Sequence, residues 1–259
     1  MCTIFFSYNR HPDYWLIVAA NRDEFYERPT RHAAFWEENP AILAGRDLRG
    51  NGTWMGITRG GRMAAITNVR DPESNRADAP TRGNLVVDFL ATRQEPRRYL
   101  ETLRATGARY NGFNLILGNG STLCYYTNRN GGAGEIPPGV HGLSNGFLNT
   151  PWPKVRTGTE RFAALVEGGG KIEAEALFSL LQDERRAPDA LLPHTGVGIE
   201  WERILSSLHI SSEVYGTRSA TLLFMGRDGR VTYLERTYPR GTPDRDRHET
   251  RRFDFTVSP

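Results

Sequence analysis

Two short apolar runs near the start of the chain constrain the fold more than any other feature. Thr3–Tyr8 and Trp15–Ala20 each have the length of one strand, and the turn-forming stretch Asn9–Asp13 separates them. Runs this close together pair as an antiparallel hairpin, in which the end of the second strand lies beside the start of the first. The sequence therefore predicts that the polar stretch Asn21–Glu24 forms a rim beside the chain start.

Cys2 lies at that chain start. Cysteine is small enough for the initiator Met1 to be removed, and the processed chain would then carry a thiol and a free α-amine on one residue. The two groups titrate near about 8.5 and about 7.7–8.0, so Cys2 would supply both nucleophile and base at neutral pH. The alternative is an ordinary strand cysteine behind a retained Met1.

Asp23 and Arg22 are the charged neighbours that the hairpin brings toward Cys2. We expect Asp23 to lie near the Cys2 amine and Arg22 to favour the thiolate electrostatically. Adjacent residues of a continuing strand point to opposite faces, so Arg22 and Asp23 face the same group only if the strand ends before Arg22. The alternative is a solvated loop that holds an ordinary Arg–carboxylate pair.

Seven short motifs occur in an order that is typical of one family. They are Cys2, Asn21–Glu24, Thr67–Arg70, Asn111–Asn114, Leu143–Asn145, Asn149–Lys154 and Gly216–Ser219. Together they resemble the NRDE family, whose eukaryotic members are the transport-and-Golgi-organisation 2 proteins. The resemblance implies an α+β fold of the N-terminal nucleophile hydrolase type, a four-layer αββα sandwich of two antiparallel sheets. It also implies a single domain over residues 1–259, with residues 239–259 as a C-terminal extension.

The resemblance extends to the penicillin V acylases and conjugated-bile-salt hydrolases, and it implies catalytic roles. With Cys2 as nucleophile, Asp23 resembles the aspartate that holds the amine in those enzymes. Asn145 resembles their asparagine that stabilises the oxyanion, and Arg218 resembles the arginine that sits near the nucleophile. Asn68 is a further candidate for the oxyanion hole.

Substrate-binding residues are expected around this centre. The candidates come from the motifs and from aromatic residues that could line an acyl pocket: Asn21, Arg22, Asn68, Trp54 and Trp152. Aromatic residues in sheets and at helix starts are usually core, which is the alternative for both tryptophans. The related enzymes commonly carry an arginine three residues before the aspartate, where this chain has Ala20, so the role of Arg22 stays open.

Apolar spacing predicts strands first, then helices, then strands, an order that suits the sandwich better than alternating βαβ units. Helical patterns begin at Arg82, at Pro96, near Pro151–Pro153, at Glu173 and at Trp201. Two-residue turn signals predict hairpins at Gly60-Gly61, Asn119-Gly120 and Asp228-Gly229. We expect a loop over residues 28–39, a mobile loop over residues 71–81 beside the site, and a solvated tail over residues 240–252.

Composition limits the partners. The formal net charge is +3 with interspersed arginines, and we expect no nucleic-acid partner. No apolar run approaches the ~20 residues of a membrane span and no basic-then-apolar leader opens the chain, so we expect a cytoplasmic protein without stable membrane insertion. Two cysteines and six scattered histidines indicate no disulfide framework, no metal site and no cofactor, although His11 could in principle ligate haem.

Two function classes fit these observations. The first is a cysteine amidohydrolase that cleaves a small amide or related acyl bond through an acyl-Cys2 intermediate. The second is a binding or trafficking protein for haem, acyl-coenzyme A or another hydrophobic ligand. The nucleophile with Asp23 and Asn145 favours the enzyme, and the displaced arginine favours the binder. A processed Cys2 predicts a thiol pKa about one or two units below that of a free thiol, whereas a retained Met1 predicts a merely buried thiol.

Overall fold

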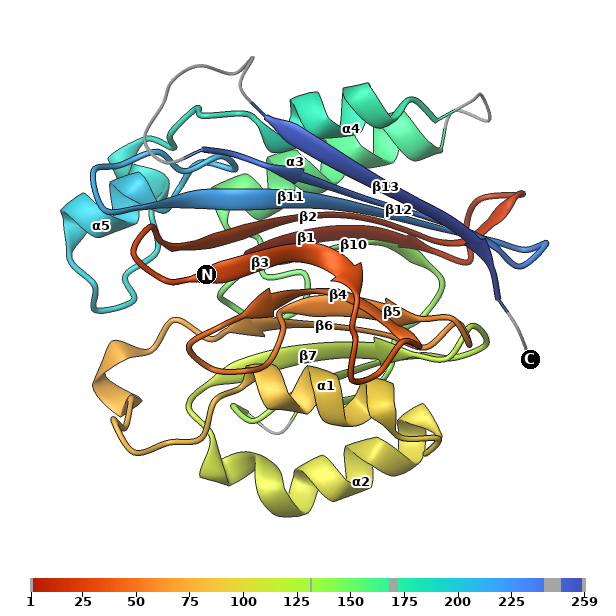
Figure 1. The fold of residues 1–259 in the computed structure, drawn as a ribbon. Coiled ribbons are helices and arrows are strands. Elements are labelled where there is room, and N and C mark those ends of the chain that lie inside the picture. The colour runs from red at the N-terminus through yellow and green to blue at the C-terminus, as the bar shows by residue number, and fades with distance from the viewer. Residues whose placement is uncertain (1, 131, 168–171, 240–247, 258–259) are drawn as a thin grey trace. The chain divides into compact units, whose positions relative to one another are not determined.

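The computed structural model describes residues 2–130, 132–167, 172–239 and 248–257 (Figure 1). The chain forms two compact units. The first comprises residues 1–27 and 138–254, and the second comprises residues 28–137 and 255–259. Each unit is therefore built from two separate segments of the sequence, and each is described in turn.

The first unit is built on a six-stranded sheet with the strand order β10-β1-β2-β11-β12-β13. Its strands are β1 (Cys2–Tyr8), β2 (Tyr14–Phe25), β10 (Gly139–Leu143), β11 (Tyr215–Gly226), β12 (Arg230–Thr237) and β13 (Glu249–Thr256). β1 and β2 pair antiparallel, which confirms the hairpin predicted from the two apolar runs. β2 continues through Asn21–Glu24, so these residues belong to the strand itself and not to a loop at its rim.

Helices cover one face of this sheet. α3 (Pro153–Val166) and α4 (Ala174–Leu181) place Phe162 and Phe178 in a buried cluster with Phe5 of β1. α3 begins at a proline, where the missing N–H would have no helical partner. α5 (Ile199–Ile204) begins before the predicted start at Trp201. It ends at Ile204, after which the Ser206 hydroxyl donates to the Arg203 carbonyl (2.7 Å).

The second unit is built on a seven-stranded sheet whose spatial order follows the chain, from β3 to β9. Its strands are β3 (Thr30–Phe35), β4 (Ile42–Asp47), β5 (Met55–Thr58), β6 (Met63–Asn68), β7 (Phe113–Gly118), β8 (Leu123–Thr127) and β9 (Ala133–Glu135). Gly61 and Gly120 have φ values of 77° and 88° in the predicted hairpin turns, a conformation that favours glycine. α1 (Gly83–Ala91) and α2 (Pro96–Thr106) pack on the sheet through Phe89 and Leu103.

Two predicted irregular segments contain strands instead. Residues 30–35 form β3, where a loop was expected, because an edge strand with a single buried residue, Ala33, lacks a clear apolar alternation. Residues 249–252, expected in a solvated tail, belong to β13 at the edge of the six-stranded sheet. Residues 240–247 of that predicted tail lie outside the described residues. The expected α+β class with two antiparallel sheets is confirmed.

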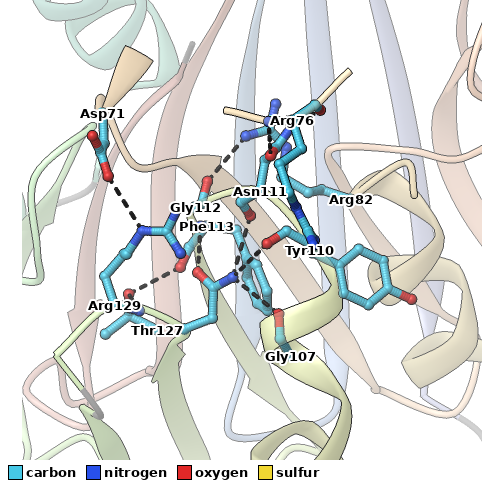
Figure 2. Close-up of polar contacts among 11 residues, drawn as sticks. Asp71, Arg76, Arg82, Gly107, Tyr110, Asn111, Gly112, Phe113, Thr127 and Arg129 are labelled. Atoms are coloured by element: carbon cyan, nitrogen blue, oxygen red, sulfur yellow. Dashed lines mark hydrogen bonds and ion pairs between the residues drawn. The ribbon is translucent and has the colours of Figure 1, made fainter. Parts of the chain in front are cut away.

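The predicted loop over residues 71–81 is fastened inside the second unit by a polar cluster (Figure 2). Asn111 accepts the backbone N–H of Arg76 through Oδ1 (2.8 Å) and donates from Nδ2 to the Arg76 carbonyl (2.9 Å). Arg129 forms an ion pair with Asp71 at 3.4 Å. Asn128 donates to the carbonyls of Gly107 and Tyr110, both at 3.0 Å. The polar side chains of this region therefore bind backbone groups of neighbouring loops.

Candidate active site

The register of the six-stranded sheet brings Cys2 beside the polar end of β2. Cys2 pairs with Arg22, and Thr3 pairs with Asn21. Directly opposed residues of an antiparallel pair share one face, so Cys2 and Arg22 point to one side and Asp23 points to the other. The strand does not end before Arg22 as one alternative required. The residue across from the thiol is Arg22 and not Asp23.

Asp23 is held in a fixed position by the neighbouring strand β11. The residue is 1% exposed, and its Oδ1 accepts a hydrogen bond of 2.7 Å from the Thr217 hydroxyl. Thr217 in turn accepts the backbone N–H of Ile210 (2.9 Å), which orients its hydroxyl hydrogen toward the carboxylate. The Tyr215 hydroxyl donates to the Asp23 carbonyl (2.9 Å). Thr217 and Tyr215 are site-forming residues that sequence reasoning did not single out, although Thr217 lies in the Gly216–Ser219 motif.

Ser144 and Asn145 approach Cys2 from the other flank of β1. They follow β10, which pairs with β1 through Ile4 and Leu143. The Ser144 hydroxyl lies 3.2 Å from the Cys2 carbonyl oxygen and 3.3 Å from Oδ1 of Asn145. Asn145 is 1% exposed. Its Oδ1 accepts the Ser144 hydroxyl, and its Nδ2 is the atom that can donate a hydrogen bond to a substrate oxygen. Ser144 was not predicted as a site residue. Its position in the sequence, directly after a strand and before Asn145, could have indicated it.

Arg218 lies in a β-bulge of β11, between the residues that pair with Asp23 and Arg22. Its Nη1 donates to the carbonyls of Phe25 (2.9 Å) and Tyr26 (3.3 Å). The guanidinium group is thus directed at the backbone that follows β2. A place for Arg218 beside the thiol stays a prediction.

Asn21 uses its amide to hold the backbone together. Its Nδ2 donates to the carbonyls of Leu181 (2.8 Å) and Leu208 (2.9 Å), and the residue is buried. These bonds tie the end of α4 and the segment before β11 to the strand that carries Arg22 and Asp23. The structure therefore gives Asn21 a positioning contact, while its predicted substrate contact stays a prediction.

The other predicted binding residues lie apart in the chain. Trp152 is half-buried and precedes α3, where its carbonyl accepts the N–H of Arg156 (2.9 Å). Trp54 and Asn68 belong to the second unit. Trp54 packs against that unit's core, where a side chain at Gly45 would meet its ring, and Asn68 ends β6. Trp54 therefore packs in the core, which was the alternative to its predicted role in substrate binding.

Burial sets the protonation of the Cys2 thiol. Removal from water raises the pKa of Cys2, and the negative charges of Asp23 and Glu24 act in the same direction, whereas the positive charges of the chain-terminal amine and of Arg22 lower this pKa. The net direction is upward in a chain that carries Met1, which agrees with the alternative of a buried thiol, and the depressed pKa of a processed Cys2 stays a prediction. The physical reason is the cost of forming a thiolate in a poorly solvated strand.

The described part of the chain contains neither a metal-binding cluster of side chains nor a helix that could span a membrane. There, no three His, Cys, Asp or Glu side chains gather closely enough to hold a metal ion. Within the same residues, no helix combines the length and apolarity that a membrane span requires. His11 does not fit a role as haem ligand, because it is 6% exposed, packs against Tyr14 and accepts the Asp13 N–H at Nδ1 (3.1 Å).

Comparison with known proteins decides the family. A family model described as Transport and Golgi organisation 2 matches residues 1–240. A homolog of that name from Bos taurus is 39% identical over 277 residues, covering 98% of this chain and 99% of that protein. The chain belongs to the Transport and Golgi organisation 2 family. Its human homolog is 38% identical over 281 residues, covering 99% of both chains, and the predicted NRDE resemblance is confirmed.

A solved structure supports the fold of this Transport and Golgi organisation 2 family member. A mutant of the conjugated bile acid hydrolase from Clostridium perfringens matches with a TM-score of 0.50 and 10% identity. The match covers 100% of this chain and 97% of the hydrolase. At this identity the likeness concerns the fold alone, and it confirms the predicted N-terminal nucleophile hydrolase type.

Proposed function

We propose that the chain is a cysteine amidohydrolase of the N-terminal nucleophile type, acting on a small amide or acyl substrate. The observation that carries this proposal is the register of one sheet end, where Cys2 has Arg22 across from it, Asp23 next to Arg22, and Ser144-Asn145 on its other flank. A nucleophile, a fixed carboxylate and a buried amide donor are the groups that acyl transfer requires.

The reaction begins after removal of Met1. The freed α-amine of Cys2 takes the thiol proton, and Sγ forms a bond to the carbonyl carbon of the substrate amide. The carbonyl oxygen then carries the negative charge, and Nδ2 of Asn145 is the proposed donor to it. When the C–N bond breaks, the leaving amine takes the proton and the acyl group stays on Sγ as a thioester. Water attacks the thioester, the Cys2 amine accepts its proton, and the acid leaves as the thiol is restored.

In this scheme Asp23 binds the protonated α-amine of Cys2. Its carboxylate is buried and receives the Thr217 hydroxyl at 2.7 Å, so it is positioned before substrate arrives. Arg22, on the face of the thiol, lowers the Cys2 pKa and so favours the attacking thiolate. The amine released by processing adds a base next to the thiol that the unprocessed chain lacks.

The test combines processing, labelling and turnover. Intact mass before and after a limiting dose of iodoacetamide at about pH 6.5 should show loss of Met1 and one label on Cys2. Cys124 is the internal control, since it is fully buried and burial raises its pKa to about 11. A panel of amides and acyl esters should then give an acyl-Cys2 mass. Retained Met1, or a Cys2 that labels no faster than Cys124, would sink the mechanism.

A second candidate is a binding or trafficking protein that keeps the fold for a hydrophobic ligand such as acyl-coenzyme A. One observation favours it: burial raises the pKa of Cys2 and thereby opposes thiolate chemistry. Ligand-induced stabilisation without turnover, in a chain that retains Met1, would support this candidate. A cytoplasmic location stays a prediction under either function.

A further inference from the structure

The segment after β10 carries the motif Asn149–Lys154, to which the proposed reaction assigns no role. β10 is an edge strand of the six-stranded sheet, with β1 beside it. The chain leaves β10 after Leu143, turns, and returns to the outer side of β10 at Asn149, whose backbone pairs with Gly142. Residues 144–148 therefore form a short loop, and the proposed oxyanion donor Asn145 lies on it.

Asn149 closes this loop through its backbone and its side chain. Its N–H donates to the Gly142 carbonyl (2.8 Å), and its Oδ1 accepts the Gly142 N–H (3.1 Å). Its Nδ2 lies 3.0 Å from Nδ1 of His141. Asn149 thus binds two successive residues of β10, one through the backbone and one through the side chain.

The contact with His141 has a defined direction. Oδ1 of Asn149 is identified by the Gly142 N–H that it accepts, so the atom that faces the ring is the amide nitrogen, which only donates. Nδ1 of His141 is therefore the acceptor, and the ring carries a hydrogen on Nε2. The ring is 6% exposed and stacks on Phe6, its partner across β1, with 5.1 Å between the ring centroids. This stack fixes the plane of the ring and keeps Nδ1 directed at Asn149.

The loop is anchored at both of its ends. At its start, the Ser144 hydroxyl donates to the Cys2 carbonyl (3.2 Å). At its end, the Thr150 N–H donates to the Phe147 carbonyl (3.0 Å), and Oγ1 of Thr150 accepts the Phe147 N–H (2.9 Å). Asn149 completes this end in the left-handed backbone conformation, with φ of 59°, which asparagine adopts more readily than most residues. Asn145 is thus held between the nucleophile's own backbone and the outer side of β10.

We propose that Asn149 and His141 are positioning residues for Asn145, which they serve by closing the loop that carries it. This inference rests on the proposed amidohydrolase function. An oxyanion donor acts only when it is held at hydrogen-bond distance from the place where the negative charge develops. The contacts that support such a donor therefore affect turnover more than substrate binding. In this role Asn149 and His141 act through Asn145 and do not contact the substrate.

Asn149→Gly is the first test, because glycine removes the amide and keeps the left-handed backbone conformation. We expect kcat to fall about tenfold with KM changed by less than about twofold, since a misplacement on the order of 1 Å can cost about 10²-fold. Asn51→Gly is the matched control, because Asn51 is exposed in the second unit and has a similar φ of 55°. An equal loss of kcat in both variants, or a loss confined to KM, would overturn the positioning role.

The Asn145→Ala background tests whether the effect passes through Asn145. There, Asn149→Gly should lower kcat by less than about twofold, because the donor that it positions is already absent. A further loss of about tenfold would show that Asn149 acts by another route and would overturn the proposal.

A pair of His141 variants tests the same hydrogen bond from its other side. His141→Phe keeps a ring on Phe6 but lacks the acceptor, and it should lose as much kcat as Asn149→Gly. His141→Asn lacks the ring but places an oxygen acceptor where Nδ1 was, and it should keep kcat within about threefold of the unmodified chain. Equal losses in the two variants would show that ring packing, and not the bond to Asn149, holds the loop, and would overturn the role of His141.

Backbone hydrogen exchange separates this proposal from the amidohydrolase proposal, because it needs no substrate. Residues 143–149 should exchange faster in Asn149→Gly and His141→Phe than in the unmodified chain, and Asn51→Gly should leave them unchanged. Unchanged exchange in the first two variants would overturn the loop closure, whether or not the chain hydrolyses amides. If the unmodified chain forms no acyl-Cys2, the amidohydrolase proposal fails, and faster exchange would still support closure of the Asn145 loop by Asn149 and His141.

Discussion

Each unit of the protein has one region rich in polar motif residues, and the two regions use them differently. In the second unit, Asn111 and Asn128 bind backbone groups of neighbouring loops (Figure 2). In the first unit, Asn21 does the same, but Cys2, Asp23 and Asn145 converge on one sheet end. Asn21, Asn111 and Asn128 therefore have a structural role, since their side-chain amides hydrogen-bond backbone groups of other segments. What distinguishes the candidate site is a set of different chemical groups at one sheet end, namely a thiol with an arginine across from it and a buried carboxylate on the next residue.

The largest expected effect comes from the nucleophile. Cys2→Ser should reduce amide turnover by about 10³-fold or more, because the hydroxyl is a poor nucleophile in a site arranged for a thiol. The readout is product release together with the acyl-enzyme mass. Cys124→Ala is the matched control and should leave turnover per folded molecule unchanged. If the Cys2→Ser variant is as active as the unmodified chain, Cys2 is not the nucleophile, and the polar residues at this sheet end have a structural role only.

The oxyanion donor gives the next effect. Asn145→Ala should lower kcat by about 10²–10³-fold with a smaller change in KM, since the lost hydrogen bond strengthens only as charge develops. Steady-state kinetics on the best substrate of the amide panel measure this split. Asn128→Ala, which removes an asparagine of the second unit, is the control. If both variants lose the same fraction of kcat, Asn145 acts through the fold and not on the oxyanion.

Asn128 itself tests the fastening role. Its Nδ2 donates to Gly107 and Tyr110, and its Oδ1 accepts the Phe113 N–H at 2.9 Å. Asn128→Ala leaves these backbone groups without their partner and should lower the free energy of unfolding by about 2–3 kcal/mol. Urea denaturation measures the loss. If Asn128→Ala changed turnover but not the free energy of unfolding, Asn128 would have a catalytic role and not the structural role assigned to the second unit's asparagines.

Asp71 gives the smallest effect, and it depends on pH. Hydrogen bonding from Ser74 and the charge of Arg129 lower the pKa of Asp71 in the folded chain. A depressed folded pKa contributes stability above the unfolded pKa of about 3.9, and this stability is lost as pH falls through the folded value. Asp71→Asn should therefore lower the free energy of unfolding by about 0.5 kcal/mol at pH 7, because the pair is partly exposed.

That difference between Asp71→Asn and the unmodified chain should shrink as the pH is lowered below about 4. Paired urea denaturations at pH 7 and pH 3 check it. A difference that stays constant with pH would show that the carboxylate charge does not fasten this loop. The polar cluster of the second unit would then act through its neutral amides alone.

Local patterns were sufficient to predict much of the chain. The opening hairpin, the helix start at Pro96 and the glycine turns at 61 and 120 were predicted correctly, because periodicity, proline and positive φ act on neighbouring residues. β3 was missed because it buries a single residue and shows no clear alternation. The start of β13 was missed because its charged residues were taken for part of a solvated tail, although Phe253 and Phe255 alternate with polar residues.

The sequence by itself determined the family, through an ordered set of motifs, and the presence of a cysteine, an aspartate and an asparagine in that set. Only the tertiary structure decided how they meet. Because side chains alternate along a strand, a single register step decides that Arg22 and not Asp23 faces the thiol. Burial, which depends on the whole fold around Cys2, then decides that the thiol pKa moves upward.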